Sequence, residues 1–167
     1  MSISVFSAPP VSPNEGRREE AVLKSGALQV RDDKVLQDIV EQIRASFQAR
    51  ISAVSIIHQD WQYLIAAAGI PAGVYSRRTS FCAHAVASSS PVLYVADAQR
   101  DRRFAGNPAV EDGRLRFYAA AQVQACELPI GTLCVLDPRP RSEEPGAKLD
   151  QLSLLARKVS DRLRSLA

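Results

Sequence analysis

The sequence predicts an α+β domain in which one antiparallel sheet has helices on one face and long connections over the other. Three observations indicate this fold class. Apolar residues recur at helical spacing near both ends of the chain, over residues 32–47 and 149–166. Two stretches in the middle, residues 51–69 and 117–137, each consist of two apolar arms around a short turn, as in β-hairpins. The connections between these elements are long enough to cover the open face of the sheet.

Two helices are expected before the sheet and one after it. Residues 15–28 carry a short apolar run in polar helical sequence, interrupted at Gly26. The next helix is predicted to begin after Asp32, whose side chain is of a type that caps helices. Its apolar stripe consists of Val35, Leu36, Ile39, Val40, Ile43 and Phe47. The last helix carries a leucine-rich stripe over residues 149–166.

The first hairpin and a short helix are expected next. Residues 51–57 and 61–69 form the arms of the hairpin, and Pro71 and Gly73 open the loop that follows it. Beyond this loop, Thr79 or Ser80 caps a short helix with the sequence "FCAHAVA".

A further strand and the second hairpin complete the sheet. The strand is expected at residues 92–96, and an arginine-rich connection leads from it to hairpin arms at residues 117–124 and 130–137. The turn of this hairpin is predicted to pass through Glu127 and Pro129, with Cys126 as an exposed thiol nearby. In the last arm we expect one face to carry Ile130, Thr132, Cys134 and Leu136. Leu133 and Val135 then point to the other face.

Composition and charge limit the classes of function. Hydrophobic residues make up 46% and charged residues 23% of the chain, as in ordinary soluble globular proteins. Lys and Arg outnumber Asp and Glu by 21 to 18, and the arginines of residues 100–116 alternate with acidic residues, so no nucleic-acid-binding surface is expected. No apolar run approaches the ~18 residues of a membrane span, and no signal peptide is recognisable. Three cysteines without CxxC spacing fit a reducing cytoplasm.

The chain divides into a tail and one domain. Residues 1–14, with prolines among serines, are expected to form a mobile, disordered tail. Residues 15–167 are expected to form a single domain that includes the helices at both ends.

Four motifs resemble a known family. They are "SFCAHAV" at residues 80–86, "VADAQRDRRFAGNPAV" at 95–110, "RFYAAA" at 116–121 and "IGTLCVLD" at 130–137. In this order and spacing they resemble the GAF domain, and most closely the bacterial subtype found at the N-terminal end of many sensor histidine kinases and diguanylate cyclases. The likeness extends from about Arg17 to the C-terminus.

The resemblance implies a PAS-related fold with a central antiparallel sheet of five or six strands. It places the terminal helices on one face and a pocket on the other, covered by a lid of loops and a short helix. It also implies a regulatory role, in which a small molecule enters the pocket and changes the packing of the terminal helices. Those helices are expected to form a homodimer that passes the signal to an output protein. The ligand and any cofactor stay unknown at this point.

Cys82 and His84 lie two residues apart on the predicted short helix, so their side chains are expected to point about 200° apart. A Cys-His catalytic pair is therefore not expected. We favour burial of Cys82 as a small hydrophobic residue over a reactive thiolate, because no base is expected beside it. His84 is expected to bond a neighbouring backbone group or to face the pocket. With His58 as the only other histidine a metal site is not expected, and the chain has neither the Cys-His dipeptide of bilin attachment nor a haem signature.

The predicted ligand-binding set is Phe81, Cys82, His84, Asp97, Asp101, Arg103, Phe104, Asn107, Phe117, Tyr118 and Thr132. Its polar members between residues 97 and 107 lie on the long connection, where side chains can face a ligand. An Arg-Asp pair and an Asn-capped turn could equally hold that loop together without a ligand. The aromatic members would supply apolar walls of the pocket or belong to the core.

Two other functions compete with sensing. A few free-standing GAF proteins reduce free methionine sulfoxide with cysteines above the pocket, and Cys82 falls near one of those positions. Residues 100–116 contain no cysteine, so the attacking thiolate expected there is missing and no enzymatic activity is favoured. In the other alternative, the protein's own side chains fill the pocket and the domain only dimerises. The preferred hypothesis is a stand-alone, cytoplasmic sensor module.

Overall fold

The computed structural model describes residues 5–142 and 145–167. A six-stranded antiparallel sheet forms the centre, with the strand order β3-β2-β1-β6-β5-β4. The strands are β1 (Ile51–His58), β2 (Trp61–Ala68), β3 (Gly73–Ser76), β4 (Val92–Val95), β5 (Phe117–Ala125) and β6 (Leu128–Asp137). The predicted α+β fold class and the count of five or six strands are confirmed.

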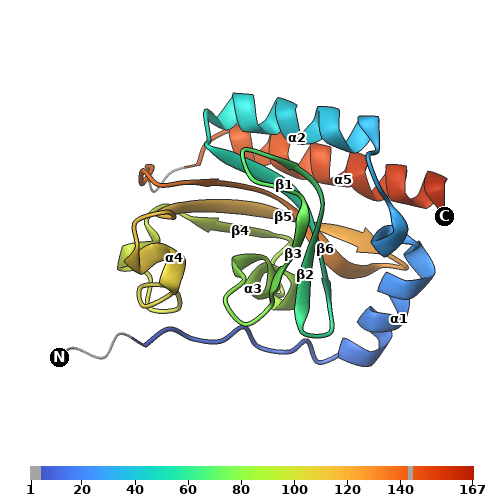
Figure 1. The fold of residues 1–167 in the computed structure, drawn as a ribbon, viewed down its shortest axis with the longest axis horizontal. Helices are drawn as coiled ribbons and strands as arrows, with labels where there is room; N and C mark the ends of the chain where they lie inside the picture. The colour runs from blue at the N-terminus through green and yellow to red at the C-terminus, as the bar shows by residue number, and fades with distance from the viewer. Residues whose placement is uncertain (1–4, 143–144) are drawn as a thin grey trace.

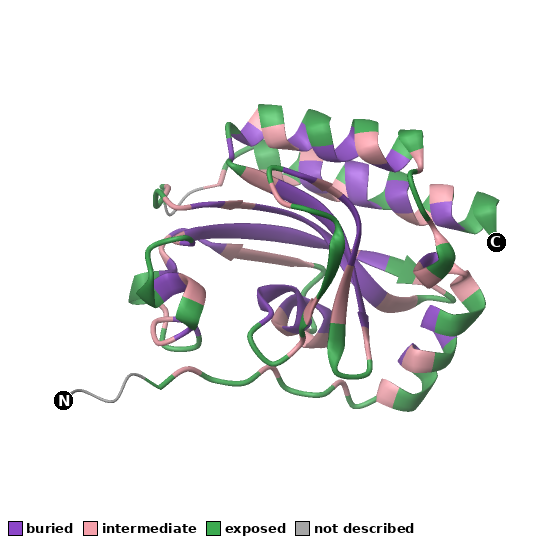
Figure 2. Cartoon of the chain, viewed as in Figure 1, coloured by how far each residue is buried: buried purple, intermediate pink, exposed green. Residues whose placement is uncertain are grey.

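Helices cover the two faces of the sheet differently (Figure 1). The long helices α2 (Lys34–Phe47) and α5 (Lys148–Leu166) lie side by side across one face. The other face carries the short helices α3 (Phe81–Ala87) and α4 (Pro108–Glu111) and the 3-10 turn η2 (Ala98–Arg100). We call α3 together with residues 97–116 the lid. Figure 2 shows that the inner sides of α2 and α5 and the central strands are buried, so the sheet separates two apolar cores.

The cap of α2 is Asp33 and not the predicted Asp32. Asp33 has the extended backbone of an N-cap residue, and its carboxylate accepts a hydrogen bond from the Leu36 amide at 3.0 Å. Asp32 instead adopts a left-handed backbone (φ 50°) that turns the chain into the helix. The Asp33 carboxylate also pairs with Arg162 of α5 at 2.8 Å, so one side chain joins the two helices that cover the sheet.

The predicted helix over residues 15–28 is shorter in the structure. Helix α1 (Glu15–Ser25) ends where Gly26 takes a left-handed conformation (φ 69°), and the 3-10 turn η1 (Ala27–Gln29) follows. Helix α1 packs against β6 and β1 at one end of the sheet, beside the hairpin turns, instead of lying across the sheet face with α2 and α5.

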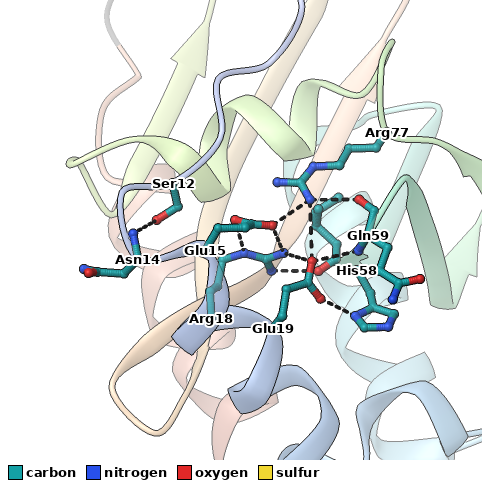
Figure 3. A network of polar contacts seen from close by, with 9 residues as sticks. Ser12, Asn14, Glu15, Arg18, Glu19, His58, Gln59 and Arg77 are labelled. Atoms are coloured by element: carbon teal, nitrogen blue, oxygen red, sulfur yellow. Dashed lines mark hydrogen bonds and ion pairs between the residues drawn. The ribbon is translucent and has the colours of Figure 1, made fainter.

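An ion-pair network fixes α1 to the sheet (Figure 3). The Arg18 side chain is fully buried and donates to the Ile57 carbonyl at 2.7 Å, and its guanidinium pairs with Glu15 at 2.8 Å and Glu19 at 3.0 Å. Glu15 also accepts a bond of 2.8 Å from Arg77, which lies between β3 and α3. The network therefore joins α1, the first hairpin and the segment that leads into the lid.

This network makes folding stability sensitive to acid. Burial raises the pKa of Glu15, but hydrogen bonds from Arg18 and Arg77 outweigh it and lower the pKa from 4.5 to about 2. A folded-state pKa below the unfolded value stabilises the fold above pH ~4.5, and this contribution is lost as the pH falls toward 2. After allowance for solvent screening we expect it to be about 1–2 kcal/mol. Between pH 7 and pH 3, urea unfolding should show a loss of stability that is smaller by about this amount in Glu15→Gln than in the wild type and in Glu20→Gln, an exposed control. Equal acid sensitivity of all three proteins would contradict the expectation.

Two parts of the sheet differ from the sequence prediction. Residues 73–76 form the edge strand β3, where only a loop was expected, because they pair with residues 61–64, the first half of β2. Ile130 points toward α2 and α5 and not to the face of Cys134, so that prediction is wrong. The reason is a β-bulge: Val123 pairs with Gly131 and Gln124 with Pro129, which leaves Ile130 as the extra residue.

The turn of the second hairpin consists of Cys126 and Glu127. Both residues have positive φ angles, 52° and 62°, as the right-handed twist of a two-residue hairpin requires. Pro129 therefore lies in β6 and not in the turn. Cys126 is exposed, as predicted.

The N-terminal segment runs along the lid. Residues 1–4 of the predicted tail lie outside the described residues, and residues 5–14 form neither helix nor strand. The Ser7 amide donates to the Arg103 carbonyl at 3.1 Å, and a ring nitrogen of His84 lies 3.1 Å from the Ser7 carbonyl. The mobility of this tail stays a prediction, but its described part has a defined course across α3 (Figure 1).

Candidate functional site

A cavity of about 260 Å³ lies between the sheet and the lid. Its floor is formed by β1, β2 and β6, and its walls by β3, the N-terminus of α3 and the region of α4. The lining residues are Ile51, Ala53, Gln62, Leu64, Ile70, Tyr75, Ser76, Thr79, Ser80, Phe81, Cys82, Asn107, Pro108, Ala109, Arg114, Leu115, Tyr118, Cys134 and Leu136. Most of these side chains are apolar, and the polar ones lie mainly where the two lid helices begin.

The polar side chains at this end of the cavity hold the lid together. Ser80 caps α3 by accepting a hydrogen bond of 3.0 Å from the Ala83 amide, and its hydroxyl also bonds to Gln62 of β2. Asn107 caps α4 by accepting from the Ala109 amide at 3.0 Å, while its side-chain nitrogen donates to the Thr79 carbonyl at 3.0 Å. Asn107 thus joins the starts of both lid helices, and Ser80 joins α3 to the sheet.

A sulfur and hydroxyl cluster lies at the back of the cavity. The sulfur atoms of Cys82 and Cys134 are 3.8 Å apart, and the Tyr118 hydroxyl donates to the Cys82 sulfur at 3.0 Å. The hydroxyls of Ser55 and Thr132, paired across β1 and β6, lie beside Cys82. Within the described part of the chain these two buried hydroxyls have no hydrogen-bond partner of good geometry.

The contacts within the cluster shift the pKa values of its members in opposite directions. The neighbouring Cys134 thiol, together with nearby hydroxyls, lowers the pKa of Cys82 in spite of its burial. Donation to Cys82 and burial raise the pKa of Cys134 well above its usual value. Burial likewise raises the pKa of Tyr118. The Tyr118 hydroxyl, which donates to the Cys82 sulfur at 3.0 Å, favours the thiolate form of that residue.

His84 lies on the outer side of the lid, away from Cys82, so the prediction that the two side chains diverge is confirmed. Its ring packs edge-on to Phe104 with a centroid distance of 4.8 Å, and Phe104 stacks on Phe81 at 4.0 Å. The Arg103 guanidinium covers the Phe104 ring at 4.9 Å. Burial lowers the pKa of His84. These side chains fasten α3 to the loop beyond it.

Comparison with known proteins identifies the architecture. The family model of the GAF domain matches residues 33–163. This chain belongs to the GAF domain family. Its GAF fold is similar to that of the GAF domain of an Acinetobacter phosphoenolpyruvate-protein phosphotransferase, with 14% identity, a TM-score of 0.63, and coverage of 86% of this chain and 90% of the other. A free methionine-R-sulfoxide reductase of Neisseria meningitidis is similar over 100% of both chains, with 15% identity and a TM-score of 0.60.

One relative is similar in sequence over almost the whole GAF domain. A cyclic di-GMP phosphodiesterase of Pseudomonas aeruginosa is 35% identical over 163 residues, which is 96% of this chain. The matched region is only 28% of the length of that phosphodiesterase. The chain thus resembles one part of a larger enzyme.

The GAF domain brings four predicted site residues to the cavity, namely Phe81, Cys82, Asn107 and Tyr118. Phe117 lies on the opposite face of the sheet, where it packs against Phe47 of α2 with a centroid distance of 6.1 Å, so it is no pocket wall. The cause is the alternation of β5, which turns adjacent residues to opposite faces. Thr132 lies beneath α3 beside Cys82 and does not line the open cavity.

Asp97 and Asp101 of the lid form ion pairs within it. Arg116 holds Asp97 with two bonds of 2.7 Å, and Arg103 holds Asp101 at 2.7 Å. Neither pair lines the cavity, and each lowers the pKa of its carboxyl group. Of the two alternatives left open by the sequence, the contacts favour the one in which these residues hold the loop together.

Sequence reasoning missed the side of the cavity formed by β2 and β3. Gln62 and Leu64 lie on the face of β2 that lines the cavity. Tyr75 and Ser76 also line it, and they belong to the edge strand β3, where only a loop was expected. The alternation of β2 was a usable signal, whereas the short β3 carries little pattern of its own. Across residues 5–142 and 145–167 no group of three or more His, Cys, Asp or Glu side chains is placed to hold a metal ion. No helix in the described ranges is both long and apolar enough to cross a bilayer.

Proposed function

We propose that this GAF domain is a regulatory module that senses a small molecule in the cavity beneath its lid. The cavity itself is the observation that carries this proposal, because a domain that served only as a scaffold would fill the space with its own side chains. The cavity lies between the sheet and the short helices α3 and α4. The resemblance implies that family members bind their ligands on this same face of the sheet. The proposed role is binding and signalling, without catalysis.

The lining defines the class of ligand. The cavity volume of about 260 Å³ is near the lower end for small-molecule sites, so a small metabolite fits and a cyclic dinucleotide does not. Among the described lining residues only Arg114 is charged, and Asp112 pairs with it at 2.8 Å. Gln62 and Thr79 provide hydrogen-bonding groups at the polar end. We therefore expect an uncharged ligand with an apolar body and one polar end.

The ion-pair network offers a route from the cavity to α1. Ser76 and Thr79 line the cavity, and Arg77 between them bonds to Glu15 of α1. A ligand that moves this segment changes the contacts that hold α1 to the sheet. We propose that the terminal helices carry this change to a second copy of the chain and to an output protein. The phosphodiesterase relative makes cyclic di-GMP turnover the first output to test.

A variant that fills the cavity tests the proposal. Ala109 lines the cavity from the lid, so Ala109→Phe should occupy the space, whereas Ala147→Phe places the same ring on an exposed site before α5. In a thermal-shift screen of metabolites, a ligand at about 100 times its Kd should stabilise the wild type by about 2.7 kcal/mol, a rise in Tm of roughly 5–10 °C. Ala147→Phe should respond equally, and Ala109→Phe should need at least tenfold more ligand.

Two outcomes would contradict sensing in this cavity. One is a ligand whose affinity is the same for Ala109→Phe and Ala147→Phe, which would place binding elsewhere. The other is a folded wild type that no metabolite stabilises and that native mass spectrometry, on protein purified from its own host, shows as a monomer without bound molecules. The same spectra test the proposed homodimer.

An assay separates this role from the enzymatic alternative. Incubation with free methionine sulfoxide and dithiothreitol should yield no methionine, because the lid contributes no cysteine from residues 97–116. Methionine that disappears in Cys82→Ser would establish reductase activity in place of sensing.

A further inference from the structure

Two thiols far apart in the sequence meet at the back of the cavity. Cys82 belongs to α3 of the lid and Cys134 to the central strand β6, and their sulfur atoms are 3.8 Å apart. Both side chains are buried, with 3% and 1% of their surface exposed. Both also line the cavity, so a molecule the size of hydrogen peroxide can reach them through it. Cys126 is exposed on the far hairpin turn and provides an internal comparison.

We propose that Cys82 and Cys134 form a peroxide-sensitive dithiol that closes to a disulfide and fixes the lid helix α3 to strand β6. The two thiols line the proposed ligand cavity, but their link needs no ligand and does not depend on the proposed sensing role. Rotation of the two side chains must bring the sulfur atoms from 3.8 Å to about 2.05 Å.

The surroundings of Cys82 favour the charged and oxidised forms of its sulfur. The Tyr118 hydroxyl already donates to this sulfur at 3.0 Å. Ser55 and Thr132 add hydroxyls that are fully buried and otherwise without a good partner, an arrangement that costs free energy in a purely apolar core. A thiolate, or the oxygen of a sulfenic acid, supplies the acceptor that these donors lack. The same contacts lower the pKa of Cys82, which increases its thiolate fraction.

The reaction balances with one hydrogen peroxide. The Cys82 thiolate attacks a peroxide oxygen, the O–O bond breaks, and the departing hydroxide takes up the proton that Cys82 lost, so water leaves and a sulfenic acid remains. The Cys134 sulfur then attacks the Cys82 sulfur and the S–O bond breaks. The leaving hydroxide takes the Cys134 proton and forms a second water. The two thiols are oxidised by two electrons, and the peroxide is reduced to two waters.

Mass spectrometry of the folded protein tests the proposal. Reduced protein is treated with a slight excess of hydrogen peroxide, then denatured and alkylated, and circular dichroism before denaturation verifies that it is folded. We expect the intact mass to show the loss of two hydrogens and one alkyl label where untreated protein carries three, one for each cysteine. Peptide mapping should find Cys82 joined to Cys134, and dithiothreitol should restore three labels.

Variants separate the pair from nonspecific oxidation. Cys126→Ser should form the same link at an unchanged rate, because Cys126 lies outside the cluster. In Cys134→Ser the second step is blocked, so dimedone should trap a sulfenic acid on Cys82. The proposal is overturned if Cys82 and Cys134 both stay fully alkylated under conditions that oxidise Cys126, or if the link that forms includes Cys126.

Discussion

Replacing Gly131 by alanine should destabilise the domain by about 3 kcal/mol, at the upper end for overpacked sites. Gly131 lies in β6, and a Cβ atom there would be 1.9 Å from the Ser55 carbonyl oxygen of β1. Backbone cannot move aside as a flexible side chain can, so β1 and β6 would have to separate. These strands are the two central strands of the sheet, and both apolar cores pack on them.

Urea unfolding of Gly131→Ala beside Gly16→Ala measures this cost. A Cβ on Gly16, in the first turn of α1, meets no atom within 4 Å, so the same chemical change should be neutral or stabilise by up to about 1 kcal/mol there. A loss below about 1 kcal/mol for Gly131→Ala would show that the two strands adjust easily and that the contact does not set their register.

The parts of the fold with a strong repeating pattern were predictable from the sequence. The α2 stripe and both hairpins have periods that identify a helix or a strand without any knowledge of neighbours. Features that depend on pairing were not predictable in this way. The strand β3 exists because it pairs with β2, and Ile130 changes face because the β5 register shifts by one residue.

The candidate site was predictable in part for the same reason. Phe81, Cys82, Asn107 and Tyr118 belong to motifs that the resemblance placed at the pocket, and the structure brings them there. Phe117 could have been excluded beforehand, because it precedes Tyr118 on one strand and both cannot face the same side. The approach of Cys82 to Cys134 had no local signal. The two cysteines are 52 residues apart in the sequence, and they meet only when α3 packs over β6.

Replacement of Arg18 by methionine should have the largest effect, a loss of about 3–5 kcal/mol in the free energy of unfolding. The fully buried guanidinium neutralises Glu15 and Glu19 and satisfies the Ile57 carbonyl at 2.7 Å. Methionine retains much of the apolar volume, so the loss reports the Ile57 carbonyl left without its donor and the two carboxylates left with fewer partners. Arg77 still pairs with Glu15, which places the expected value toward the lower end of this range.

Matched variants distinguish this electrostatic cause from simple loss of packing. Arg17→Met changes an exposed arginine on the same helix and should alter the stability by less than about 0.5 kcal/mol. Adding Glu15→Gln and Glu19→Gln to Arg18→Met should recover part of the loss, because the two carboxylates that lost Arg18 are then uncharged. If Arg18→Met unfolds at the same urea concentration as Arg17→Met, the network does not hold α1 to the sheet. The proposed route from the cavity through Arg77 to α1 would then lose its mechanical basis, since that route needs a helix whose position depends on these ion pairs.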